Sequence, residues 1–298
     1  MRVTSQSIQN IFLNNLTDVR KRLQEKQTQI ALGKKVTKPS DNPFSATRLL
    51  RLNSQIENID TYLDNINNGK SHVNITISVM EKVQEQVQNV IADLSNSLDA
   101  TENKKDYAAK VDLALENLLS LANYRYNGKY IFGGTNQEEK PYGWDSTNSF
   151  IEEKTTSLDK YQKIKISDSV TQIINEPGRD LFGTVGNPPG TDIFNLLISI
   201  RDKLNNGQDV DTSDLEALDK INTHMIGEVT KMGTYSKRME NSQTLLENLR
   251  LDVETLMSKE QEVDVPRAML DMENYQASLE RTLKISSKIL PKSILDYI

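Results

Sequence analysis

One hydrophobic repeat of unusual length limits what this chain can fold into. Alternate steps of three and four residues from Leu49 reach fifteen positions up to Leu98, and thirteen of them are apolar, Lys70 and Gln84 being the exceptions. A seven-residue repeat kept this long is typical of a single helix with a narrow apolar stripe. At about 1.5 Å per residue that helix measures about 75 Å. Because an ordinary globular domain has a radius of gyration near ~13 Å, the repeat predicts an elongated helical rod.

Four further segments carry helical patterns. The first, near the N-terminus, keeps the same spacing from Phe12 to Ile30 and is interrupted at Lys26. Another runs from Tyr107 to Leu121 and ends where glycines begin. A second long rod helix is predicted by an apolar residue at every seventh position from Leu218 through Met225, Met232, Met239 and Leu246 to Val253. The last helix opens near Pro266, since proline suits a first helical turn.

The middle of the chain has a different composition. Residues 128–190 hold the only tryptophan and eight of the thirteen glycines. The runs "KYIFG", "SFIEE", "QKIKIS" and "VTQII" are rich in strand-forming residues, short, and bounded by turn residues. They are too few and too short for a large sheet. We therefore expect a fold that is mainly α, an antiparallel helical rod with terminal coiled-coil helices and a small β-rich insertion.

The connector "GKKVTKPSDNP", residues 33–43, separates the first two predicted helices. Its glycine is placed to end the first helix, while the asparagine and second proline form a cap and a first helical position. The other proline restricts the residue before it and the unfolded connector as a whole. We interpret the segment as a rigid hairpin between helices, with Gly33, Lys34, Lys35, Pro39, Asn42 and Pro43 as its key residues. Its lysines either meet an acidic neighbouring surface or are solvated loop residues, the commoner case.

Composition narrows the function classes. The formal charge of −6 comes from interspersed acidic and basic residues, so there is no basic field for nucleic acid or an anionic membrane. The chain has no cysteine, which excludes disulfides and thiolate metal sites. No apolar run approaches the roughly 20 residues that span a bilayer, and "MRVTSQSIQN" lacks the core of a cleavable signal peptide.

No catalytic, cofactor-binding or metal-binding pattern is found. His72 and His224 have no second ligand at metal spacing and are expected on solvated helix faces. The glycine-rich runs match neither a P-loop nor a Rossmann turn, and the acidic pairs Glu138–Glu139 and Glu152–Glu153 are typical of surfaces. We therefore expect a protein that is not an enzyme. An enzyme built on a helical scaffold stays as a distant alternative.

Several motifs resemble the flagellin superfamily. They are "RVTSQSI" at the start, "QIALGKKVTKPSDNP" after the first helix, "GKYIFGGT" after the third, "NEPG" in the insertion and "ENYQASLERTLKISSKILPKSILDYI" at the end. Residues 1–137 and 191–298 carry most of the match. Flagellins proper usually have a segment like "SSGxRINSAxDDAAG" where this chain has "ALGKKVTKPSDNPFS". That departure favours the hook-associated proteins of the hook–filament junction, with a flagellin filament subunit as the alternative.

The resemblance implies a division of the chain into five parts: an N-terminal coiled-coil helix and connector (1–44), the first half of a rod (45–127), an outward-facing β-rich insertion (128–190), the second half of the rod (191–260) and a C-terminal coiled-coil helix (261–298). It also implies a ring of identical subunits, contact with hook-associated protein 1 and with flagellin, a cytosolic chaperone on the C-terminal helix, and no cofactor. The expected location is the extracellular flagellum, after type III export without a cleaved signal.

The terminal stripes give assembly a physical reason. Each fully buried apolar side chain contributes about 1.5–3 kcal/mol, while ordering the backbone costs about 1–2 kcal/mol per residue. The two sums nearly cancel for a solitary helix pair, so we expect the terminal helices to order when neighbouring subunits cover them. The predicted assembly residues are Ile8, Phe12, Leu16, Val19, Leu23, Ile30, Met272, Tyr275, Leu279, Leu283, Leu290, Ile294 and Tyr297.

Overall fold

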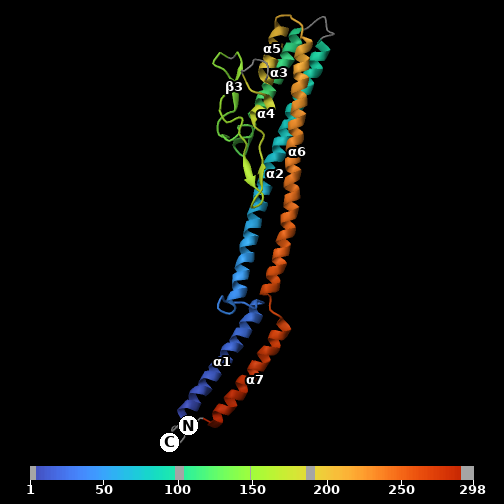
Figure 1. The fold of residues 1–298 in the computed structure, drawn as a ribbon. Helices are drawn as coiled ribbons and strands as arrows, with labels where there is room; N and C mark the ends of the chain where they lie inside the picture. Colours follow the sequence, from blue (N-terminus) through green and yellow to red (C-terminus); the bar gives the residue numbers. More distant parts are fainter. Residues whose placement is uncertain (1–4, 98–103, 148, 186–191, 290–298) are drawn as a thin grey trace. The chain divides into compact units, whose positions relative to one another are not determined.

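Helices make up most of the fold (Figure 1). The computed structural model describes residues 5–97, 104–147, 149–185 and 192–289. The prediction of a mainly α fold with a small β insertion is confirmed. The helices are α1 (Ser5–Leu32), α2 (Pro43–Ser97), α3 (Lys104–Ala122), α4 (Gly178–Phe182), α5 (Ile193–Asn205), α6 (Thr212–Gln261) and α7 (Val265–Ile289).

The β structure consists of three separate antiparallel hairpins. They pair β1 (Arg125–Tyr126) with β2 (Lys129–Tyr130), β3 (Tyr142–Trp144) with β4 (Ile151–Glu153), and β5 (Lys163–Lys165) with β6 (Thr171–Ile173). Each of the four predicted runs contains a strand, and no large sheet forms among the described residues. The strands β1 and β3 were not expected, because "RY" and "YGW" are too short to show a pattern.

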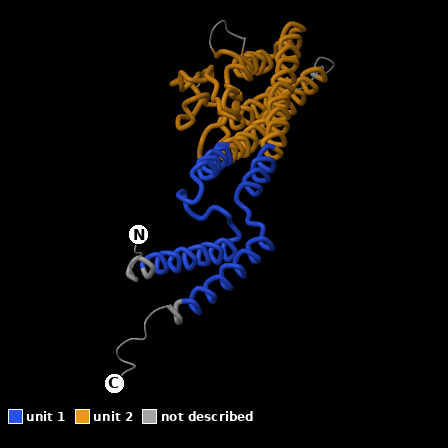
Figure 2. The backbone as a smooth tube through the Cα atoms, turned by 60° about the horizontal axis from the view of Figure 1, so that its bottom comes forward, with its two compact units in different colours: residues 1–58, 249–298 blue, residues 59–248 orange. Residues whose placement is uncertain are grey.

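Contacts divide the chain into two compact units, shown separately coloured in Figure 2. Unit 1 comprises residues 1–58 and 249–298, and unit 2 comprises residues 59–248. The long helices α2 and α6 each contribute one part to both units.

Unit 1 is built on two helices lying side by side, α1 and α7 (Figure 2). Only Ala268 is buried among the side chains described on these two helices. The parts of α2 and α6 that belong to unit 1 contribute Leu52 and Val253, which are 7% and 6% exposed. Unit 1 therefore has a thin core.

Unit 2 has a continuous core. Two polar contacts, Lys70 Nζ to Gln243 Oε1 at 3.4 Å and Ser236 Oγ to Asn74 Oδ1 at 2.9 Å, show that α2 and α6 run antiparallel here. The predicted repeat supplies much of this core. Its buried members in unit 2 are Ile59, Ile66, Val73, Met80, Val87 and Leu94 on α2, and Leu218, Met225, Met232, Met239 and Leu246 on α6. The alternate α2 positions Leu63, Ile77 and Ile91 are half-buried.

A second layer, α3 packed against α5, adjoins this helix pair: Lys110 of α3 lies 2.7 Å from Asp93 of α2, and Lys203 of α5 lies 2.7 Å from Asp214 of α6. The separate helix α5 was not anticipated within the predicted second half of the rod. It begins after Asp192, whose carboxylate accepts a hydrogen bond from the Asn195 amide at 2.8 Å. It ends before Gly207, which adopts a positive φ of 75° and lets the chain turn into α6.

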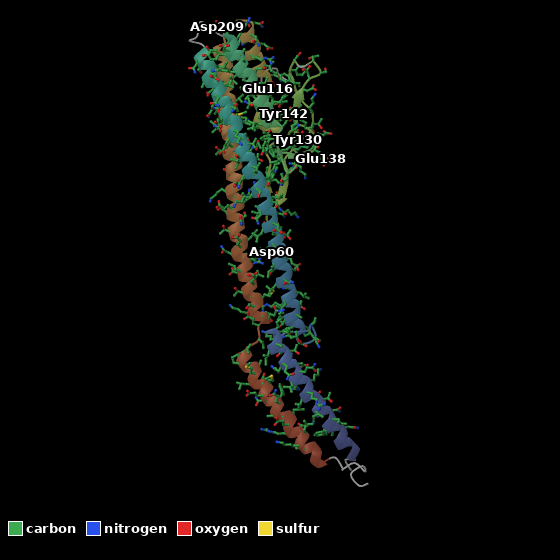
Figure 3. All side chains as sticks on the ribbon, turned by 180° about the vertical axis from the view of Figure 1, so that it is seen from behind. Asp60, Glu116, Tyr130, Glu138, Tyr142 and Asp209 are labelled. Carbon is green, nitrogen blue, oxygen red and sulfur yellow. The ribbon has the colours of Figure 1, made fainter. Side chains whose placement is uncertain are left out.

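Aromatic packing fixes the insertion to the helices of unit 2. Phe132, Tyr142, Phe182 and Phe194 form a buried cluster with ring centroids 5.2–5.6 Å apart. Figure 3 labels Tyr142 of this cluster, together with Tyr130 of β2. Because Phe194 belongs to α5, the cluster joins the hairpins to the second helical layer.

The hairpin β5–β6 lies close against α2. A Cβ atom on Gly69 would stand 2.5 Å from Ile164 Cδ1, so a larger residue there would displace the end of the Ile164 side chain. Tyr62 donates to Asp168 at 2.7 Å and Asn65 donates to the Lys165 carbonyl at 3.0 Å. These contacts hold the hairpin along the helix.

Candidate functional site

The predicted assembly stripe of α1 lies half-buried. Phe12, Leu16, Val19, Leu23 and Ile30 are neither fully covered nor fully exposed, and no described α1 side chain (residues 10–32) is buried. Ile8 is within the helix, but its side chain is outside the described residues. In the single chain, one partner helix thus covers these side chains only in part.

The matching stripe of α7 shows the same partial burial. Met272, Tyr275 and Leu279 are half-buried, and Leu283 is 44% exposed. Leu290, Ile294 and Tyr297 lie outside the described residues. The assembly role of both stripes stays a prediction.

The interruption at Lys26 has a partner on the facing helix. Its Nζ atom lies 2.9 Å from Asp271 Oδ2. A polar pair within an apolar stripe disfavours shifted alignments, since a shift would set each charge against apolar side chains. This ion pair thus favours one register of α1 on α7.

The connector begins with a left-handed glycine. Gly33 has a φ of 67°, its amide donates to Ile30 O, and the Lys34 amide donates to Gln29 O at 3.1 Å. This is the Schellman arrangement, which satisfies the last carbonyl groups of a helix. The chain then pairs with the segment between α6 and α7, the Lys35 amide donating to Gln261 O at 2.8 Å.

The helix packed along α1 is α7. A hairpin of adjacent helices would instead have paired α1 with α2, so the hairpin interpretation of the connector is wrong in that respect. The strand-like pairing of residues 34 and 35 with residues 261 and 262 explains the difference, because it ties the connector to the start of the α7 segment.

Asp41 closes the connector on itself, a role that sequence reasoning missed. Its Oδ2 atom accepts hydrogen bonds from Thr37 Oγ1 at 2.9 Å, the Thr37 amide at 3.1 Å and the Lys38 amide at 2.8 Å. These bonds, the Thr37 hydroxyl first, lower the pKa of Asp41. Asn42 then caps α2 by accepting from the Ser45 amide at 3.1 Å, with Pro43 as the first helical residue. The loop geometry is therefore set by local hydrogen bonds.

Large apolar side chains are concentrated on the outside of unit 1. Thirteen of the nineteen exposed large hydrophobic residues described lie there, although it is the smaller unit. The most exposed are Phe44 at 78%, Leu50 at 71% and Leu270 at 62%. Beside the connector, Leu49, Leu50 and Met257 help line an open hollow of about 410 Å³. Surfaces with this much exposed apolar area are typical of protein–protein contacts.

Sequence reasoning missed these outer residues, because it followed only the seven-residue stripe. They occupy the remaining faces of the helices, where polar residues would be expected in a free-standing pair. Apolar residues on a second face were the signal that could have revealed them.

Candidate metal sites and membrane spans are absent from the described residues. No group of three or more histidine, aspartate or glutamate side chains there could hold a metal ion, and no described helix meets the length and apolarity of a membrane span. The expectation of a solvated His72 was wrong: burial lowers its pKa, and its ring lies 6.4 Å from that of Tyr126. His224 is exposed, and its Nε2 atom is 2.6 Å from the Asp180 carbonyl.

Comparison with protein families gives one match over the N-terminal part. Residues 3–137 match the model of the bacterial flagellin N-terminal helical region. This range takes in α1, α2, α3 and the first hairpin.

Two named relatives extend the similarity. Flagellar hook-associated protein 3 of Escherichia coli strain K12 is 24% identical over 268 residues, which cover 84% of this chain and 82% of the relative. The Salmonella typhimurium protein of the same name is 22% identical over 189 residues, 62% of this chain and 58% of the relative.

Solved structures agree on the fold. FlgL of Bacillus cereus superposes with a TM-score of 0.58 at 19% identity, covering 70% of this chain and 99% of that one. Flagellar hook-associated protein 3 of Legionella pneumophila gives 0.62 at 12% identity, covering 70% and 97%.

Proposed function

The chain belongs to the flagellin superfamily, and from this premise we propose that it is a structural subunit joining the hook of the bacterial flagellum to the flagellin filament. The named relatives are hook-associated proteins, which favours the junction over the alternative of a filament subunit.

One observation carries the proposal: the α1–α7 pair leaves its apolar residues half-covered on the stripe and exposed on other faces. A two-helix pair alone cannot bury side chains on more than one face of each helix. Full burial contributes about 1.5–3 kcal/mol per large apolar side chain. Packing of neighbouring subunits around unit 1 therefore supplies the missing contacts.

We assign partners from the resemblance to the flagellin superfamily. Identical subunits form a ring through unit 1, hook-associated protein 1 contacts the ring on the hook side, and flagellin contacts it on the filament side. A cytosolic chaperone covers the apolar face of α7 before export, as helix-in-groove partners do. Export proceeds through the flagellar type III apparatus without a cleaved signal, and the protein acts outside the cell.

The parts of the chain divide the work. Residues 1–44 and 261–298 supply the coiled-coil contacts between subunits, residues 45–127 and 191–260 supply the rod, and residues 128–190 form the outer insertion. In the connector, Lys34 and Pro39 line the hollow beside α2, and Lys35 follows Lys34. All three residues are exposed, so a neighbouring subunit can contact them.

A deletion strain complemented with variants tests the proposal. Replacing Leu13 and Leu270 together with serine removes two side chains that are 55% and 62% exposed, and the stability change should stay within about 0.5 kcal/mol per site. Cells carrying this variant should keep intact hooks and release flagellin monomers into the medium. Filaments are counted by electron microscopy and flagellin by immunoblot.

Leu113→Ser provides the matched control. Leu113 is 61% exposed, as Leu270 is, but it belongs to α3 of unit 2. This variant should restore filaments to the wild-type level. Normal filaments in the Leu13/Leu270 variant, or equal loss in both, would overturn the assignment of unit 1 as the assembly surface.

A further inference from the structure

A carboxyl group is buried where the insertion meets α6. Glu176 lies between β6 and α4 and its side chain is 0% exposed. Lys231 of α6 places its Nζ atom 3.2 Å from Glu176 Oε1, while Glu176 Oε2 has no hydrogen-bond donor among the described residues. A buried carboxylate oxygen without a donor is costly, so the ionised form of Glu176 is poorly accommodated.

A second carboxyl group of α6 shares the same lysine. Glu228 also contacts the Lys231 ammonium group, so the carboxyl groups of Glu176 and Glu228 converge on one nitrogen atom. Two carboxyl groups thus face one ammonium group. Like charges this close cannot both ionise easily, whereas one proton between them makes a hydrogen bond in place of a repulsion.

The other titratable groups at this contact are already engaged. Tyr161, which precedes β5, donates to Asp180 of α4, and this bond raises the pKa of Tyr161 to about 12. Asp180 also offers its carbonyl to His224 of α6. The Lys231 ammonium stands 6.0 Å from the Tyr161 ring centroid. None of these groups donates to Glu176 Oε2, so the missing proton has to come from Glu176 or Glu228 itself.

We propose that the insertion is docked on α6 by a proton shared between Glu176 and Glu228, so that its attachment weakens as that proton is lost. The proton replaces the absent donor to Glu176, and Lys231 balances the single remaining charge. Loss of the proton leaves two negative charges, that of Glu176 buried and that of Glu228 half-buried, against one positive charge, which favours opening of the contact. The inference concerns unit 2 alone and does not depend on a flagellar role.

The direction of the pH effect follows from the folded-state pKa values. Burial, followed by the hydrogen bond and charge of Glu228, raises the pKa of Glu176 from its ordinary value of 4.5 to about 8. Burial is also the largest single influence on Glu228 and opposes its ionisation, but hydrogen bonding by Lys231 and Glu176 and the charge of Lys231 together outweigh it and lower the pKa of Glu228. The folded state therefore retains, between about pH 4.5 and 8, a proton that the unfolded state has released.

Docking should consequently be favoured most at the acidic end of this range. The equilibrium constant for unfolding of the insertion should rise up to about tenfold per pH unit through the range and level off above the folded pKa. Lys231 affects stability in a separate pH range. Its pKa is raised in the folded state, so the stability that it contributes is lost only above its ordinary pKa of 10.5.

The test compares wild-type protein with Glu176→Gln, which cannot ionise. Trp144 is the only tryptophan and lies in β3, so its fluorescence reports unfolding of the insertion. Denaturant titrations at pH 5 to 9 should give an unfolding constant that increases with pH in the wild type relative to Glu176→Gln. Because His72 is present in both proteins, any effect of its titration cancels in this comparison. Parallel curves for the two proteins would overturn the proposal.

Two further measurements complete the design. Glu138→Gln, at an exposed glutamate of the same insertion (Figure 3), should titrate like wild type. If Glu176→Gln does not fold, carboxyl carbon NMR of the wild type decides: a glutamate midpoint near 8 supports the shared proton. If every glutamate titrates near its ordinary value, the shared proton does not exist.

Discussion

Unit 1 and unit 2 use the same seven-residue repeat with different results. In unit 2 one line of the repeat is buried along each long helix, Met225, Met232 and Met239 each being 0% exposed, while Leu63, Ile77 and Ile91 of the alternate line are half-buried. In unit 1 the corresponding stripe residues, such as Leu16 and Val19, remain half-buried. The difference arises because α3, α5 and the insertion add contacts to α2 and α6 in unit 2, whereas α1 and α7 pair with each other.

The comparison shows that a seven-residue repeat specifies only part of the packing around a helix. A heptad stripe selects the face on which a helix meets its first partner. It does not determine how many layers follow, and burial of the whole stripe needs a second layer. We therefore expect substitutions to be costly at the buried positions of unit 2 and mild on the stripe of unit 1, which the single chain covers only in part.

The largest expected contrast involves two glycines with the same backbone conformation. Gly134 in unit 2 has a φ of 66°, and a Cβ atom there would stand 1.7 Å from the Ser157 carbonyl oxygen. Gly33 in unit 1 has a φ of 67° and nothing within 4 Å of that position. Gly134→Ala should destabilise by about 4–5 kcal/mol, because strain and a backbone clash add.

Gly33→Ala should cost only the left-handed backbone strain, about 1–2 kcal/mol. Denaturant unfolding followed by circular dichroism measures both variants, with Trp144 fluorescence reporting unit 2 separately. Equal costs for the two substitutions would contradict the view that the neighbourhood of Gly134 is closely packed.

The sequence predicted the elements of both units better than their contacts. Leu49 and the positions after it predict α2 because apolar spacing is a local signal, and β4 follows from β-rich residues between turns. The contact of Glu176 with Lys231 joins residues 55 positions apart, and no local pattern marks it. His72 likewise looked solvated, because the hairpin that covers it follows more than fifty residues later.

The candidate site shows the same limit. Gly33 and Asn42 have the expected residue types for helix ends, and each satisfies backbone groups within five residues. The pairing of Lys35 with Gln261 could not be read from spacing, since it joins opposite ends of the chain. The sequence therefore predicts the local hydrogen bonds at helix ends, whereas residue spacing does not identify the partner of each helix.

A smaller contrast is expected from deleting equivalent stripe residues. Leu218 of unit 2 is 0% exposed, and Leu218→Ala should cost about 3 kcal/mol through lost burial and a cavity. Leu16 of unit 1 is half-buried, so Leu16→Ala should cost about 1 kcal/mol. Denaturant midpoints of the isolated chain measure both. A larger loss at Leu16 would mean that unit 1 is tightly packed without its neighbours.

The smallest expected energy change accompanies removal of the ion pair within the unit 1 stripe. Lys26 and Asp271 are 27% and 41% exposed, so replacing both with leucine should alter stability by about 1 kcal/mol or less. The effect should appear instead in the register of α1 on α7. With both stripes wholly apolar, a shift of one heptad, roughly 10 Å, leaves the packing nearly unchanged.

Spin labels at Gln24 and Glu273, both exposed, measure this shift, and the absence of native cysteine makes their attachment unique. One distance is expected for wild type and two for the leucine pair. In unit 2, Lys110 and Asp93 form a similar pair at 2.7 Å. Replacing both with leucine should leave one distance between labels at Glu85 and Glu116, because the covered core already fixes the register there. A single distance in both variants would show that packing alone aligns α1 with α7, and that Lys26 interrupts the stripe without specifying register.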